Sequence, residues 1–180
     1  MRRGSLRAHC EHAVAVRIFT IGVYGSDRDA FFEALARARI DVFLDLRRRR
    51  AVRGPQYAYA NARRLTAELE RRGIVYRHVL ELAPSRELLA LQHAIDARES
   101  GMRARTALAP EYVRRYTAEV LRPFDFRGLA PELEGFRAPV LFCVEREAHA
   151  CHRSLVAPRL ARALRATAVK DIVPPPTAQR

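Results

Sequence analysis

The sequence predicts an α/β fold, in which a mostly parallel sheet of about five strands carries helices on both faces. Three observations lead to this prediction. The chain has 180 residues, about the length of one domain. Short apolar runs alternate along it with stretches of helical periodicity. One run, IDVFLDL at 40–46, is almost continuously apolar, which is typical of a strand buried in a parallel sheet. We therefore expect one α/β domain over residues 17–173, between a flexible basic arm (1–16) and a Pro-rich tail (174–180).

The domain is expected to begin with a strand, a helix and a second strand. RIFTIGVYG at 17–25 is apolar and β-branched and contains two glycines at its end, so it predicts a strand. Ser26 or Asp27 can cap the helix that follows, because a short side-chain oxygen there accepts a hydrogen bond from a free backbone N–H. The run at 40–46 then forms the second strand.

The next segment separates the second strand from a strong helix. Residues 47–60 are too charged and too broken by turn residues for a regular element. NARRLTAELERRG at 61–73 predicts a helix, with Asn61 near its cap and Gly73 as its terminator. A third strand is expected over IVYRHVLEL at 74–82.

The second half of the chain continues the alternation. SRELLALQHAIDARES begins like a capping box and has its apolar residues at helical spacing. The expected elements are a helix over 85–100, a basic loop over 101–109, a helix over 110–122, an irregular connection over 123–138, a strand over 139–145, a helix entered near Cys151, and a strand over 168–173. Strands alternating with helices predict right-handed βαβ units.

Composition excludes several classes of protein. Apolar residues make up 49%, and no apolar run approaches the roughly 20 residues that a membrane helix needs, so we expect no membrane association. The first residues lack the apolar core of a secretory signal, which predicts a cytoplasmic protein. Cys10, Cys143 and Cys151 are then expected to be reduced thiols, because an odd number of cysteines without export does not make a disulfide framework.

The chain is strongly basic. Lysine and arginine exceed the acidic residues by 33 to 20, a net charge of +13, and Lys170 is the only lysine. Such an arginine bias comes in part from overall composition, yet the charge still attracts phosphates. We expect either an anionic small molecule or a nucleic acid as partner, and the alternative is that the charge is only solvated.

Chemically useful side chains follow the predicted strands. Because the carboxyl ends of parallel strands lie at one edge of a sheet, these side chains are expected to come together there. They are Asp45, Arg47 and Arg48 after the second strand, His78 and Glu81 after the third, Cys143, Glu145 and Arg146 after the fourth, and Cys151, His152 and Arg153 before the next helix.

Four segments resemble a known family. They are TIG at 20–22, DLR at 45–47, GIVYRHVLEL at 73–82 and CVEREAHACHRSL at 143–155. The last contains C-x-E followed by C-H-R-S, and the chain is similar through it to the domain of unknown function 488 family. The resemblance implies an α/β fold but no reaction. It also implies a functional grouping of Asp45, Arg47, Cys143, Glu145, Cys151, His152 and Arg153.

Cys151 is the candidate nucleophile or redox thiol. The start of a helix and the neighbouring His152 and Arg153 would all favour its thiolate. The alternative is a half-buried structural cysteine. Cys143, late in an apolar strand, is expected to be a packed small residue or to point outward at the strand end.

No metal or cofactor is expected. Cys143, His149, Cys151 and His152 are zinc ligands by type, but C-x7-C without a second ligand pair is a poor match to structural zinc sites. A C-x5-R loop would need arginine at position 149. The sequence also lacks the glycine-rich nucleotide motifs, so we expect no nucleotide cofactor.

The charged residues allow two interpretations each. Asp45 either orients a reacting group or pairs with Arg47 or Arg153 to join two loops. Both arginines are candidate anion ligands, because a guanidinium matches phosphate or carboxylate geometry. The loop of Arg48, Arg49, Arg50 and Arg53 beside Tyr57 and Tyr59 either binds nucleic acid or is merely solvated. His78 and Glu81 are expected to support the site or to lie on the surface.

Three functional hypotheses follow. The first is an enzyme acting on an anionic, phosphate-bearing or nucleic-acid-linked substrate. Its Cys151 would react, Glu145 and His152 would move protons, and Asp45 would orient; Arg47, Arg48, Arg153 and Cys143 would contact the substrate. The second is a non-catalytic nucleic-acid-binding module that uses the arginine-rich loop, and the third is a small metal-site protein. The sequence defines neither the reaction nor the oligomeric state.

Overall fold

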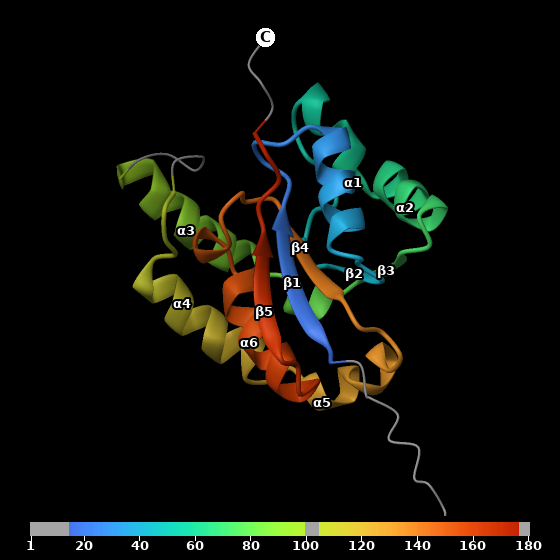
Figure 1. Ribbon diagram of the computed structural model, residues 1–180. Helices are drawn as coiled ribbons and strands as arrows, with labels where there is room; N and C mark the ends of the chain where they lie inside the picture. Colours follow the sequence, from blue (N-terminus) through green and yellow to red (C-terminus); the bar gives the residue numbers. More distant parts are fainter. Residues whose placement is uncertain (1–14, 100–104, 177–180) are drawn as a thin grey trace, which may run out of the picture.

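The computed structural model describes residues 15–99 and 105–176, which form an α/β fold as predicted (Figure 1). Five strands make one parallel sheet in the order β3-β2-β4-β1-β5. The strands are β1 (Arg17–Gly22), β2 (Val42–Asp45), β3 (Val75–His78), β4 (Pro139–Cys143) and β5 (Ala168–Ile172). The basic arm at 1–14, including Cys10, lies outside the described residues.

Helices connect the strands, with short turns between them. The helices are α1 (Arg28–Arg37), α2 (Ala62–Arg71), α3 (Arg86–Glu99), α4 (Pro110–Tyr116), α5 (Phe126–Leu129) and α6 (Arg153–Ala163). The shorter turns are η1 (Pro55–Ala60), η2 (Leu80–Leu82), η3 (Thr117–Leu121), η4 (Pro131–Leu133) and η5 (Ala148–Ala150). Among the described residues, no helix has the length and apolar character needed to span a membrane.

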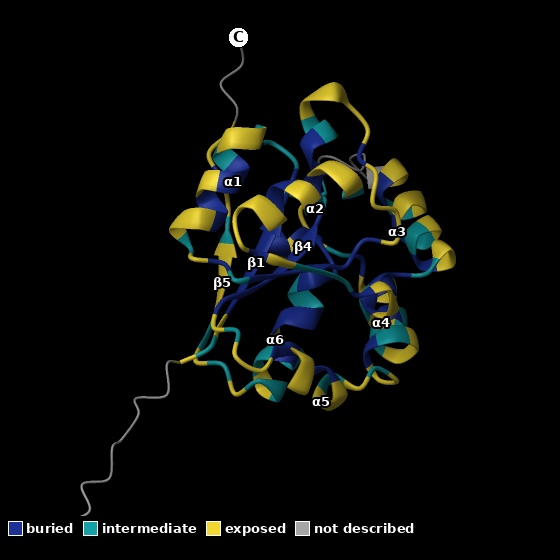
Figure 2. Cartoon of the chain, turned by 90° about the vertical axis from the view of Figure 1, so that its right-hand side faces the viewer, coloured by how far each residue is buried: buried dark blue, intermediate teal, exposed yellow. Residues whose placement is uncertain are grey.

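The sheet separates two apolar cores. On one face, Phe19 and Phe43 of the sheet pack with Phe31 of α1 and Leu69 of α2. On the other face, the sheet packs against α3, α4, α5 and α6. Figure 1 shows these two layers of helices on opposite sides of the strands. The central strands are therefore buried on both faces, whereas β5 is largely exposed at the edge (Figure 2).

The chain leaves the neighbouring strands β1 and β4 in opposite directions. From β1 it passes to α1 on one face, and from β4 it passes to α6 on the other. Such a point opens a crevice at the carboxyl edge of a parallel sheet. The two loops touch there at Gly22, where a Cβ would collide with the carbonyl of Glu145.

The two residues expected to cap helices in the first half of the chain use their side chains differently. Asp27 caps α1, and its Oδ1 accepts a hydrogen bond from the Ala30 N–H at 2.8 Å. Asn61 stands at the cap position of α2, but its Oδ1 accepts from the Val52 N–H at 2.7 Å instead. The preceding loop therefore uses the Asn61 side chain.

Several expectations for the elements were wrong. The strands expected over 17–25 and 139–145 end at Gly22 and Cys143. The third strand ends at His78, and the chain turns into η2 before residue 82. The segment 47–60 contains η1, because Tyr59 and Ala60 are buried and hold that turn against the core. The helix over 110–122 changes after Tyr116 into a wider turn, η3. The expected basic loop over 101–109 lies partly outside the described residues.

Candidate functional site

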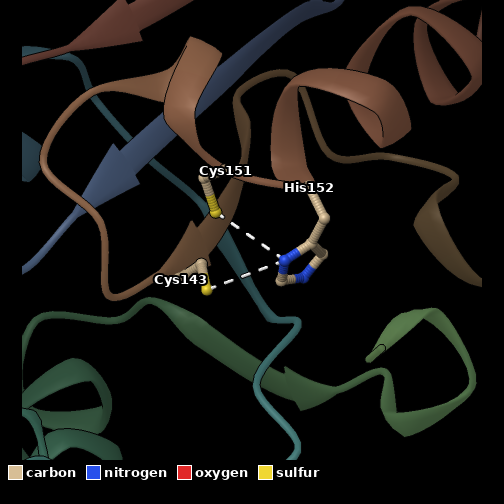
Figure 3. Close-up of side chains that lie close together, drawn as sticks. All are labelled: Cys143, Cys151 and His152. Atoms are coloured by element: carbon tan, nitrogen blue, oxygen red, sulfur yellow. Dashed lines mark hydrogen bonds between the residues drawn. The ribbon is translucent and has the colours of Figure 1, made fainter. Parts of the chain in front are cut away.

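Two thiols and one imidazole meet at the carboxyl edge of the sheet. Cys143 ends β4, Cys151 follows η5, and His152 caps α6. The Nδ1 atom of His152 lies 3.7 Å from the sulfur of Cys151 and 4.0 Å from that of Cys143. Figure 3 shows this nitrogen directed toward both sulfurs. All three side chains are buried.

The other ring nitrogen of His152 defines its tautomer. Nε2 lies 3.3 Å from the carbonyl oxygen of Leu46, just beyond β2. A carbonyl only accepts hydrogen bonds, so Nε2 carries the proton and donates. The Nδ1 lone pair is then free to accept a proton from a thiol. The ring also packs against Tyr116, with the ring centroids 5.5 Å apart.

The two thiols are electrostatically different. Burial alone raises the pKa of Cys151, but a hydrogen bond from Cys143, the positive charge that His152 carries once it holds the thiol proton, and the charge of Arg153 outweigh burial and lower it. The pKa of Cys143 is raised, because its proton is held in the hydrogen bond to Cys151 and because it is buried. The pair therefore carries its negative charge on Cys151.

Glu145 lies close enough to sense the charge of this cluster and titrates near neutral pH. Its side chain is 17% exposed, and one oxygen lies 2.8 Å from a guanidinium nitrogen of Arg105. Burial and the charge of Cys151 raise the pKa of Glu145 and Arg105 lowers it, so that the pKa comes to about 7. A carboxyl group with such a pKa can both give and take a proton at pH 7.

Arg105 is a site residue that the sequence analysis did not identify. Its guanidinium also bonds to Asp96 at 2.8 Å and to the carbonyl of Ala150 at 2.9 Å. Asp96 is buried and accepts a second bond from Gln92. A pocket of about 400 Å³ opens beside these residues. Gln92 and Asp96 are polar residues four positions apart on the buried side of α3, and this pattern was the sequence signal for the pocket.

Asp45 and Arg47 form a buried pair that joins β2 to η1. The guanidinium bonds to both carboxylate oxygens, at 2.9 and 2.7 Å, and to the carbonyl of Ala60 at 2.9 Å. Tyr76 donates a further hydrogen bond to Asp45, and the Arg47 guanidinium lies over the Phe142 ring. The loop-joining alternative therefore fits Asp45, and the Arg47 guanidinium is occupied by the protein.

Arg153 is likewise occupied. It is 1% exposed, and its three donor nitrogens bond to the Thr20 hydroxyl and to the carbonyls of Glu145 and Arg146, at 2.7 to 3.1 Å. These bonds shape the loop after β4. This geometry disfavours the expectation that Arg47 and Arg153 hold an anion, because all three nitrogens of each guanidinium already donate to protein acceptors.

Arg48, His78 and Glu81 lie apart from the thiols. Arg48 is exposed and bonds to the carbonyls of Ala83 and Pro84. His78 bonds to the Arg47 carbonyl at 2.9 Å, and Glu81 is exposed. The hydrogen bonds of Arg48 and His78 therefore go to other parts of the chain than the thiol cluster.

The cluster has the donor set of a soft metal site. The sulfurs of Cys143 and Cys151 and a nitrogen of His152 all lie within 4.8 Å of one another. Thiolates and imidazole are zinc ligands; a closed site takes four ligands and a catalytic site three. The C-x7-C spacing is a poor match to zinc sites in which one loop supplies paired ligands. Here the ligand atoms come from the end of β4 and the start of α6, which only the fold brings together. His149 is exposed and is not one of them.

A comparison with protein families places the chain. The family model described as domain of unknown function DUF488 matches residues 27–160, most of the domain and the whole candidate site. Comparison with curated proteins and with solved structures found no match. The predicted resemblance is confirmed, and the chain belongs to the DUF488 family of domains of unknown function.

Proposed function

We propose that this protein is an enzyme that acts on an anionic, phosphate-bearing or nucleic-acid-linked substrate, with Cys151 as its reacting thiolate. One observation carries the proposal: the Nδ1 lone pair of His152 faces the Cys151 sulfur at 3.7 Å, and its tautomer is set by Leu46. A nucleophile beside a base that a third group orients is the usual arrangement of covalent catalysis.

The proposed reaction is a displacement on the substrate, in which the Cys151 sulfur is the nucleophile. The thiol gives its proton to His152 Nδ1, and the sulfur electron pair forms a bond to the electrophilic atom of the substrate. The leaving group departs with the electron pair of the broken bond and takes a proton from the Glu145 carboxyl group. Water then displaces the sulfur, losing a proton to Glu145, while His152 returns the thiol proton.

Substrate binding is assigned to different residues from those first expected. Cys143 supports the thiolate by its hydrogen bond, and Asp45 positions the loop after β2. Arg146 is the anion ligand we favour, since its Nη1 is buried without a hydrogen-bond partner among the described residues and lies beside Gly25. A buried donor without a partner is costly unless a ligand supplies the acceptor. Arg48 is a further cation at this edge of the sheet.

The alternative function is a nucleic-acid-binding module without chemistry. It is favoured by the exposure of Arg49, Arg50 and Arg53 in the loop after β2. The aromatic partners expected in that loop are less available, because Tyr59 is buried and the Tyr57 hydroxyl accepts a hydrogen bond from Gly25.

Alkylation by a small neutral reagent, followed residue by residue with mass spectrometry over pH, separates these functions. Cys151 should react with a midpoint below the roughly 8.5 of a free thiol, with Cys10 as the internal reference. His152→Gln should raise that midpoint, and Arg122→Gln, remote from the cluster, should not.

Two results would contradict the enzyme proposal. One is a Cys151 that reacts only on unfolding, together with a Cys151→Ala variant that loses stability and nothing else. The other is stoichiometric zinc in the purified protein, which would make the thiols metal ligands.

A further inference from the structure

A second feature of the molecule lies on the opposite face of the sheet from α6. It is a groove of about 530 Å³ between α1, η1 and α2, which we call the arginine groove. Its polar lining includes Arg28, Arg63, Arg64, Arg71 and Gln56. We propose that the arginine groove binds the sugar-phosphate backbone of a single-stranded nucleic acid, independently of the thiol chemistry.

The charge of the groove is fixed and positive. Four arginines line it against one carboxylate, Glu68, for a net charge of +3. Glu68 contacts the guanidiniums of Arg28 and Arg72, at 2.9 Å each, and that of Arg71. Burial raises the pKa of Glu68, but these arginines outweigh it and lower the pKa to about 2. Glu68 therefore stays ionised and holds Arg28 and Arg71 in place beside the groove.

Arg63 and Arg64 distinguish this groove from a general excess of arginine. Some exposed helical arginines pair with an acid one turn away, as Arg37 does with Glu33 and Arg115 with Glu119. Within the described ranges, no ion pair involves Arg63 or Arg64, although both are exposed on the first turn of α2. Other exposed arginines in the described part of the chain also lack an ion pair, but Arg63 and Arg64 are adjacent on one helical turn and both line the groove.

The shape of the groove favours an extended ligand. Arg28 and Arg71 meet at Glu68, whereas Arg63 and Arg64 lie about two turns before Arg71 along α2. Phe32, Pro55 and Ala67 add apolar surface to the lining. A strand with one phosphate per nucleotide can contact several guanidiniums in turn while its bases rest on apolar surface. A compact anion could use one or two of them only.

A pair of matched double variants tests the proposal. Arg63→Gln with Arg64→Gln removes two charges from the groove, and Arg122→Gln with Arg127→Gln removes two exposed charges on the α5 side. Binding of a short fluorescent oligonucleotide of mixed sequence is measured by anisotropy over a salt series. The groove variant should lower the slope of log K against log salt by about 1.4, whereas the control should leave it almost unchanged.

Three outcomes would overturn the inference: no binding by the wild-type protein, equal losses in the two double variants, or equal competition by polyglutamate of the same length. The last would identify an acidic polypeptide as the ligand. Thermal melting should be alike in all three proteins, because the substituted side chains are exposed. Alkylation of Cys151 in the groove variant should match wild type, so a failure here leaves the proposed enzyme function untouched.

Discussion

At the scale of single residues, the chemistry of the candidate site depends on which nitrogen of His152 carries the proton. The Leu46 carbonyl sets this, although Leu46 is 106 positions away in the sequence. Glu145 depends in the same way on its surroundings. The same carboxyl group on an exposed loop would ionise near pH 4.5, and here burial moves its pKa to about 7.

Glu145 should make stability depend on pH in a definite direction. Its pKa is higher in the folded than in the unfolded protein, so folding takes up a proton between about pH 4.5 and 7. Its contribution is full below that window and is lost as pH rises through it. Glu145→Gln should flatten the profile of urea-unfolding free energy over this window, by at most about 3 kcal/mol.

A profile that keeps its slope in Glu145→Gln would contradict this assignment. Glu147→Gln is the matched control, because its more exposed carboxylate lies two residues along the same loop. That control should leave the slope of the profile unchanged.

At the scale of elements, ion pairs join segments that lie apart in the sequence. Asp45 and Arg47 join the end of β2 to η1, and Glu68 joins α2 to α1 through Arg28. Breaking a buried pair from one side leaves an uncompensated charge, which costs more than removing both partners. We therefore make a separate prediction for each pair.

Arg47→Met should destabilise the protein by about 3–5 kcal/mol, because Asp45 is left buried with only Tyr76 as a side-chain donor. The double variant Asp45→Asn with Arg47→Met should recover much of this loss. Chemical denaturation of the two single variants and the double variant measures the coupling. Additive losses would show that the two side chains do not act as a pair.

Glu68→Gln should lower stability at pH 7 and have little effect near pH 2. The pKa of Glu68 is lower in the folded protein, so its contribution is present above about pH 4.5 and is lost as pH falls toward about 2. Thermal melting at several pH values checks this. Glu70→Gln, on the same helix but exposed, should show no such dependence.

At the scale of the whole molecule, the site exists because the loops after β1 and β4 touch at the carboxyl edge of the sheet. Gly22 permits this contact, since any side chain there would meet the Glu145 carbonyl. The same contact fixes the loop that carries Glu145 and Arg146.

Gly22→Ala should therefore be more damaging than alanine at a glycine with space around it. We expect a loss of several kcal/mol, because the obstructing atoms are backbone and cannot rotate away. Gly73→Ala is the comparison: its surroundings are open and only its positive φ of 69° adds a cost, about 1 kcal/mol. Equal losses in the two variants, measured by urea denaturation, would show that the loops separate easily.

The fold class, the five strands, most helices and the family could be predicted from local features of the sequence. These depend on local periodicity, turn residues and a contiguous motif, all of which are present in short segments of chain. The sequence also singled out Cys143, Cys151, His152 and Glu145, because residues that follow parallel strands share one edge of the sheet.

The protonation and the hydrogen-bond partners of these residues depend on tertiary contacts, which the sequence patterns do not reveal. The strand order β3-β2-β4-β1-β5 brings Leu46 to His152 and Thr20 to Arg153, contacts between residues more than 100 positions apart. Those contacts set the tautomer of His152 and occupy the guanidinium of Arg153, and another long-range contact places Arg105 against Glu145. Charge and hydrogen-bonding capacity are properties of a residue type. Whether a charge or a donor already has a partner within the protein depends on neighbours that sequence patterns do not specify.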